Sequence, residues 1–176
     1  MKIAIIGYSG SGKSTLARAL GEYYETDVLH LDTVHFLPDW VERQVEDEQK
    51  IVEDFLNSHG AWVIDGNYGK LSHGRRMNEA DHIIMMLFDR FNCFRSVWRR
   101  YRKYKNKTRP DIAEGCSEKL DLSFATWVLW RGRTKVRRNN YERIREAFSG
   151  KVTVLKNRKQ TDAFLKKLTE TGVWPE

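Results

Sequence analysis

The chain has 176 residues, of which 40% are hydrophobic and 12% aromatic, with 3 prolines and a formal net charge of +7. These values fit one folded globular domain over residues 1–176 and exclude disordered and collagen-like chains. There is no secretory signal pattern, no apolar run approaches the about 20 residues of a membrane span, and the 2 cysteines have no metal-ligand spacing. We therefore expect a cytoplasmic protein without a membrane partner.

The positive charge is concentrated in two stretches. Residues 95–109 hold eight basic side chains and no acidic one, and residues 131–145 hold seven basic side chains and one acidic one. The rest of the chain has more acidic than basic residues. A local positive field of this kind indicates a polyanionic partner, either a nucleotide with its acceptor or a nucleic acid.

Strands and helices are predicted to alternate along the chain. Short apolar, β-branched runs predict strands over 2–6, 27–31, 61–65, 81–87 and 151–155. Helical spacing of apolar residues predicts helices over 13–24, 41–58, 90–104, 120–148 with an interruption near Gly132, and 161–169, while 105–117 has the composition of a loop. This alternation predicts an α/β fold in which helices cover both faces of a five-stranded parallel sheet.

A phosphate-binding loop is predicted where the first strand meets the first helix. Residues 7–14 (GYSGSGKS) fit the pattern G-x-x-x-x-G-K-[ST]. In this pattern backbone N–H groups surround the phosphates, the lysine reaches the β and γ oxygens, and the hydroxyl of the last residue binds Mg²⁺. We expect ATP and Mg²⁺ as cofactors, with the nucleotide contacting Gly7, Ser9, Gly10, Ser11, Gly12, Lys13, Ser14 and Thr15.

Two aspartates, Asp32 and Asp65, follow predicted strands. The carboxyl ends of parallel strands lie beside such a loop, so each carboxylate can hold Mg²⁺ through water or accept a proton from an acceptor hydroxyl. The alternative is that each aspartate starts a turn or caps a helix. His35 lies three residues after Asp32 and is expected as a weak contact of the acceptor.

Four features together resemble the adenylate-kinase-like P-loop kinases: residues 7–17 (GYSGSGKSTLA), 30–32 (HLD), 62–68 (WVIDGNY) and the arginine-rich second half. The narrower resemblance, over the whole chain, is to the small bacterial proteins called DNA topology modulation proteins. The family implies a P-loop NTPase fold of the nucleoside monophosphate kinase type, with a basic lid at about residues 105–135.

The resemblance also implies roles for individual residues. Asp65 and Ser14 would hold magnesium, and Asp32 would orient or deprotonate the acceptor. Arg95 would stack on adenine, and Arg99 would face the phosphates. The acceptor would be approached by Asn67 and by Arg75 or Arg76. The returning arm of the lid would supply charge from Arg131, Arg133, Arg137 and Arg138. Asp89 and Ser117 stand where this family has prolines, so the local backbone can differ there.

The predicted activity is transfer of the γ-phosphoryl group of ATP to a small acceptor, which can be a nucleotide. One alternative is a nucleic-acid-binding protein whose stacking platforms are Trp98, Tyr101, Tyr104, Trp127 and Trp130, although aromatic residues are more often core. A second alternative is a nucleotide-dependent switch without an acceptor, because the same loop serves both functions.

Overall fold

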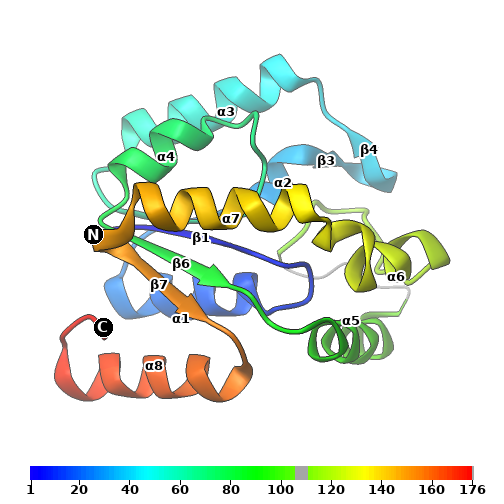
Figure 1. The fold of residues 1–176 in the computed structure, drawn as a ribbon. Coiled ribbons are helices and arrows are strands. Elements are labelled where there is room, and N and C mark those ends of the chain that lie inside the picture. The colour runs from blue at the N-terminus through cyan, green and yellow to red at the C-terminus, as the bar shows by residue number, and fades with distance from the viewer. Residues whose placement is uncertain (106–110, 176) are drawn as a thin grey trace.

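The computed structural model describes residues 1–105 and 111–175, and its centre is a parallel sheet (Figure 1). The strands are β1 (Lys2–Gly7), β2 (Val28–His30), β5 (Trp62–Asp65), β6 (His82–Met86) and β7 (Val152–Leu155), in the order β2-β5-β1-β6-β7. All adjacent pairs are parallel. The predicted five-stranded sheet is therefore confirmed, and the carboxyl ends of all five strands lie at the same edge of it.

Helices cover both faces of the sheet (Figure 1). One face carries α1 (Lys13–Tyr24), α5 (Arg90–Tyr104), α6 (Leu122–Leu129) and α8 (Arg158–Thr171). The other carries α3 (Val45–Ser58), α4 (His73–Glu79) and α7 (Lys135–Ala147). Successive side chains of a strand point to opposite faces. Ile3 and Ile5 of β1 accordingly lie in one buried cluster, and Ala4 and Ile6 lie in the other.

The segment after β2 differs from its predicted structure. The short helix α2 (Leu31–His35) follows β2, and a hairpin pairs β3 (Phe36–Leu37) with β4 (Val41–Glu42) around the 3-10 turn η1 (Pro38–Trp40). The helix predicted from residue 41 therefore begins only at Val45. Elements of two to five residues are too short to produce a periodic pattern, and α4 was missed because its HGRRMNE sequence is mostly polar.

The helix predicted over 120–148 is divided into α6, the 3-10 turn η2 (Arg131–Arg133) and α7, and a further 3-10 turn, η3 (Ser149–Lys151), precedes β7. The interruption lies near Gly132, as predicted. A Cβ atom on Gly132 would lie 2.8 Å from the carbonyl oxygen of Trp127, so a side chain cannot be accommodated there.

The two positions without a family proline have clear local structures. The side chain of Asp89 accepts hydrogen bonds from the backbone N–H groups of Phe91 (2.9 Å) and Asn92 (3.0 Å), and thereby caps α5. The carbonyl oxygen of Ser117 accepts a hydrogen bond from Trp40 Nε1 at 3.0 Å. That bond fixes part of the expected lid to the β3–β4 hairpin. Residues 106–110 of the expected lid lie outside the described residues.

Further contacts hold residues 111–119 in place. Cys116 Sγ donates to the carbonyl oxygen of Leu37 at 3.2 Å, and Arg18 on α1 pairs with Asp111 at 3.1 Å. Across residues 1–105 and 111–175, no helix has the length and apolar character needed to cross a bilayer.

Candidate active site

The loop between β1 and α1 has the backbone that its glycines allow. Gly7, Gly10 and Gly12 have φ values of 144°, 81° and 96°, in the region that favours glycine. A Cβ atom on Gly10 would lie 2.5 Å from the carbonyl oxygen of Cys93 on α5. The loop is closed internally by Ser11, whose N–H and hydroxyl donate to the carbonyl oxygen of Tyr8 at 3.2 and 2.8 Å. Thr15 is exposed on the first turn of α1.

Lys13 lies inside this loop. Its Nζ donates to the carbonyl oxygen of Tyr8 at 3.0 Å, and the side chain is partly buried. The pKa of Lys13 is lowered because the side chain is buried. The carboxylates of Asp65 and Asp32 oppose this shift without cancelling it. The ammonium group therefore lies within the electrostatic influence of both aspartates, and an anion in the loop would favour its charged form.

The side chains of Ser14 and Asp65 place oxygen atoms side by side next to the loop. The hydroxyl of Ser14 donates to Asp65 Oδ2 at 2.9 Å, and the other carboxylate oxygen, Oδ1, contacts His30 Nδ1. His30 and Asp65 are register partners in β2 and β5, so the sheet brings them together. The Ser14 hydroxyl and the Asp65 carboxylate are hard oxygen donors. Together with phosphate oxygens and waters, donors of this kind suit Mg²⁺. Within the described residues no cluster of three or more His, Cys, Asp or Glu forms a separate metal site.

Asp32 lies on α2, close to two hydrogen-bonded pairs of half-buried and buried polar side chains. The hydroxyl of Tyr68 donates to Asp32 Oδ1 at 2.8 Å. Burial, followed by the charges of Asp32, Glu48 and Asp65, raises the pKa of Tyr68, so its phenol remains a hydrogen-bond donor. His35 Nδ1 bonds Oε1 of the buried Glu48 at 2.6 Å. Sequence reasoning assigned no role to Tyr68 or Glu48, although Tyr68 closes the 62–68 motif.

Asn67 contacts the phosphate loop through its side-chain amide. Its Oδ1 accepts from the Gly7 N–H at 2.9 Å, and its Nδ2 donates to the Gly7 carbonyl oxygen at 2.6 Å. One side chain thus satisfies both backbone groups of Gly7 and fixes the start of the loop. Asn67 is also exposed, and the contact with an acceptor that the sequence predicted for it remains a proposal.

Arg76 is fully buried, at 0% exposure. Its Nε donates to the carbonyl oxygen of Leu71 at 2.8 Å, and Nη2 donates to that of Tyr68 at 2.7 Å. Burial lowers the pKa of Arg76 to about 10. The acceptor contact predicted for Arg76 does not fit this position, because its donors hold the carbonyls of the loop after β5. Arg75 instead pairs with Glu53 and Glu79.

The second basic stretch reaches the loop through two arginines. The Arg133 guanidinium lies 3.8 Å from the centre of the Tyr8 ring and donates to the carbonyl oxygen of Phe88 at 2.8 Å. Arg137 lies 4.4 Å from the ring centre of Trp127, whose Nε1 donates to Ser9 Oγ at 3.3 Å. These contacts connect η2 and α7 with the phosphate loop.

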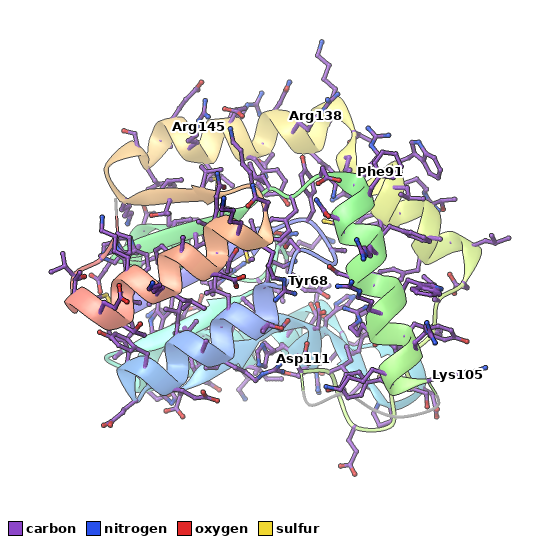
Figure 2. The ribbon with its side chains drawn as sticks, turned by 90° about the horizontal axis from the view of Figure 1, so that it is seen from below. Tyr68, Phe91, Lys105, Asp111, Arg138 and Arg145 are labelled. Atoms are coloured by element: carbon purple, nitrogen blue, oxygen red, sulfur yellow. The ribbon has the colours of Figure 1, made fainter. Side chains whose placement is uncertain are left out.

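The remaining arginines of the predicted lid are exposed, namely Arg95, Arg99, Arg131 and Arg138. Arg138 and Arg145 project outward from α7 in Figure 2, in which Phe91 and Lys105 mark the two ends of α5. Of the five aromatic residues considered as stacking platforms, Trp127 packs against a core cluster, whereas Trp98 and Trp130 are exposed.

A small cavity of about 100 Å³ adjoins the phosphate loop. It lies between the loop, the start of α1 and the first turns of α8. Its lining includes Ser11, Gly12, Thr15, Met86, Phe88, Arg158, Thr161 and Asp162. A larger hollow of about 410 Å³ lies at the other end of α1, around Gly21 and Val28, and no residue of the phosphate loop lines it.

Solved structures share this architecture. Shikimate kinase from Acinetobacter baumannii in complex with shikimate aligns with a TM-score of 0.60 and 14% identity, over 96% of this chain and 90% of that one. The chain has the fold of shikimate kinase-like P-loop proteins. Shikimate kinase from Bacteroides thetaiotaomicron aligns with a TM-score of 0.50 and 15% identity, over 97% of this chain and 96% of that one. Neither a family model nor a curated protein matches the sequence, so no sequence match supports the resemblance to DNA topology modulation proteins.

Proposed function

We propose that the protein is a phosphotransferase that moves the γ-phosphoryl group of ATP to a hydroxyl group of a small acceptor. The observation that carries this proposal is that two carboxylates, each with its own hydrogen-bond partner, both act on the charge of Lys13. Asp65, bonded to Ser14, and Asp32, bonded to Tyr68, both influence Lys13 in the phosphate loop. One carboxylate is thereby associated with the magnesium ligand and the other with a separate polar network, as transfer between two substrates requires.

The nucleotide would lie along the loop, with its phosphates at the glycine-rich turn and the start of α1, and its base toward the cavity beside α8. Lys13 would exchange the Tyr8 carbonyl for phosphate oxygens. Ser14 and Asp65 would hold Mg²⁺, which neutralises phosphate charge when bound. Arg133 and Arg137, already against Tyr8 and Trp127, are the lid arginines placed to approach transferring phosphate.

In the transfer step the carboxylate of Asp32 accepts the proton of the acceptor hydroxyl. Tyr68 orients this carboxylate by donating a hydrogen bond to Asp32 Oδ1. The acceptor oxygen forms a bond to the γ-phosphorus atom as the bond from that atom to the β–γ bridging oxygen breaks. ADP leaves, and the proton passes from Asp32 to solvent. The products are a phosphate monoester, ADP and one proton.

Substitution of Lys13 tests the nucleotide site. Lys13→Ala should abolish measurable Mg·ATP binding in calorimetry, because the side chain supplies the charge-assisted contact to the β and γ oxygens. Thermal unfolding should change little, since the lysine makes a single hydrogen bond in this structure. An unchanged affinity would refute the loop assignment. ADP release measured across a panel of hydroxyl compounds tests the transfer itself.

A nucleic-acid interaction is a second candidate, including the effect on DNA topology that the narrower resemblance implies. It is supported by the exposed ring of Trp98, over which the guanidinium of Arg102 lies at 4.9 Å. If the protein is a kinase, any duplex binding through its basic surface should be non-specific and weaken steeply with added salt. DNA binding that resists salt, selects sequence and persists in the Lys13→Ala variant would favour this candidate over the kinase.

A further inference from the structure

The acceptor side of the proposed site is strongly acidic. The segment 31–48, which forms α2, the hairpin and the start of α3, has one basic residue, Arg43, and six acidic residues: Asp32, Asp39, Glu42, Glu46, Asp47 and Glu48. The buried Glu48 contacts His35 from one side, and Glu42 Oε1 lies 3.7 Å from His35 Nε2 on the other. In Figure 1 this segment lies beyond the carboxyl ends of the strands, where substrates bind in folds of this kind.

Within residues 1–105 and 111–175, three cations near this segment contact other groups of the protein. Arg43 donates through Nε to the carbonyl oxygen of Val34 at 2.8 Å. From the neighbouring elements, Arg18 pairs with Asp111 at 3.1 Å and Lys119 lies over the ring of Trp40 at 5.1 Å. The concentrated positive charge of the chain lies instead on α5 and α7. Because segment 31–48 has six carboxylates and a single guanidinium, an anionic acceptor would meet an excess of negative charge on this side.

The same side carries a row of aromatic rings that begins at the partner of Asp32. The Tyr68 ring lies 4.7 Å from that of His35, which lies 4.5 Å from Phe36. Phe36 in turn lies 5.1 Å from Trp40. All four side chains are partly exposed. Such rings pack well against flat or ring-shaped ligands, while a carboxylate at the end of the row fixes a hydroxyl group.

We propose that the acceptor is a hydroxyl-bearing ring compound that carries no negative charge, such as a nucleoside or a sugar. This inference rests on the proposed phosphotransferase function and specifies its substrate class. The ring would pack on Phe36, and the reacting hydroxyl would lie at Asp32. That oxygen forms the bond to the γ-phosphorus atom of ATP, its proton goes to Asp32, and ADP leaves.

Matched pairs of acceptors test the inference. The full chain with Mg·ATP is given nucleosides and their 5′-monophosphates, glucose and glucuronate, glucosamine and its 6-phosphate, and shikimate, and ADP release is measured. We expect kcat/KM for the best uncharged or cationic member to exceed that of its anionic partner by at least about tenfold, because like charges disfavour the anion. The arms distinguish a nucleoside from a sugar or an amino sugar.

The outcomes separate the two proposals. Faster ADP release with anionic members would overturn the inference and leave the phosphotransferase function in place. Absence of acceptor-dependent ADP release with any compound, although Mg·ATP binds, would overturn the phosphotransferase function and the inference with it.

Two variants give a second readout. Glu42→Lys, at a side chain that is 73% exposed, should reduce the preference for the uncharged member several-fold without changing the Kd of Mg·ATP. Glu146→Lys, at an exposed position of α7, is the matched control. Phe36→Ala should raise KM for the acceptor, whereas Phe91→Ala on α5 should not. Unchanged preference in Glu42→Lys together with unchanged KM in Phe36→Ala would overturn the inference.

Discussion

Asn67 offers the sharpest test of how the phosphate loop is held. Asn67→Ala removes the two hydrogen bonds to Gly7, at 2.9 and 2.6 Å. Each contributes about 1 kcal/mol net, so the free energy of unfolding should fall by about 2 kcal/mol. For a domain of this size, that loss lowers Tm by about 4–8 °C. Because the start of the loop is also released, the Kd of Mg·ATP should rise by up to about tenfold.

Thermal unfolding followed by circular dichroism gives Tm, and calorimetry gives the Kd of Mg·ATP. Asn140→Ala is the matched control, since Asn140 is exposed on α7 and its substitution should change stability by less than about 0.5 kcal/mol. An unchanged Tm in Asn67→Ala, together with a large rise in acceptor KM, would refute the reasoning. That result would show that Asn67 contacts the acceptor, as the sequence had suggested.

Three further substitutions address separate features of the structure. Arg76→Met should lower the free energy of unfolding in urea by about 3 kcal/mol or more, because buried carbonyls of Leu71 and Tyr68 lose their donor; an unchanged value would contradict this role. Asp65→Asn should remove the gain in ATP affinity that Mg²⁺ gives in calorimetry, and a retained gain would exclude Asp65 as the magnesium carboxylate. Burial lowers the pKa of His82 below its usual 6.5. The contribution of neutral His82 to the free energy of unfolding should therefore be fully present above pH 6.5 and be lost as the pH falls to the lower pKa of the folded state. His82→Phe should reduce that loss between about pH 7 and pH 5 in urea unfolding, and a loss equal to that of the unchanged protein would contradict the assignment.

The strongest sequence predictions concerned features that are local along the chain. Helix α1 and helix α5 begin and end as their periodicity indicated, and the glycines of residues 7–14 have the backbone that their spacing requires. The pairing of Ser14 with Asp65 agrees with the shared magnesium role predicted for them, which remains a proposal.

The predictions that failed depended on which way side chains face. Arg76 was expected beside the acceptor, but the turn of α4 directs its guanidinium into the protein, where it bonds the loop after β5. No role was predicted for Glu48, which is buried on the first turn of α3 with His35 against it. Neither orientation is visible in a pattern of residue types.

The sequence by itself determined the alternation of strands and helices, the phosphate loop and the acidic character of the segment after β2, because each depends on residues close together in the chain. The tertiary structure alone decided that Asn67 fixes Gly7, that Tyr68 holds Asp32, and that Arg133, rather than Arg131, lies on Tyr8. These contacts join residues 36 to 125 positions apart, and their geometry is set by strand order and helix packing. Hydrogen bonds and ring contacts form only when that packing brings the groups within a few ångströms of each other.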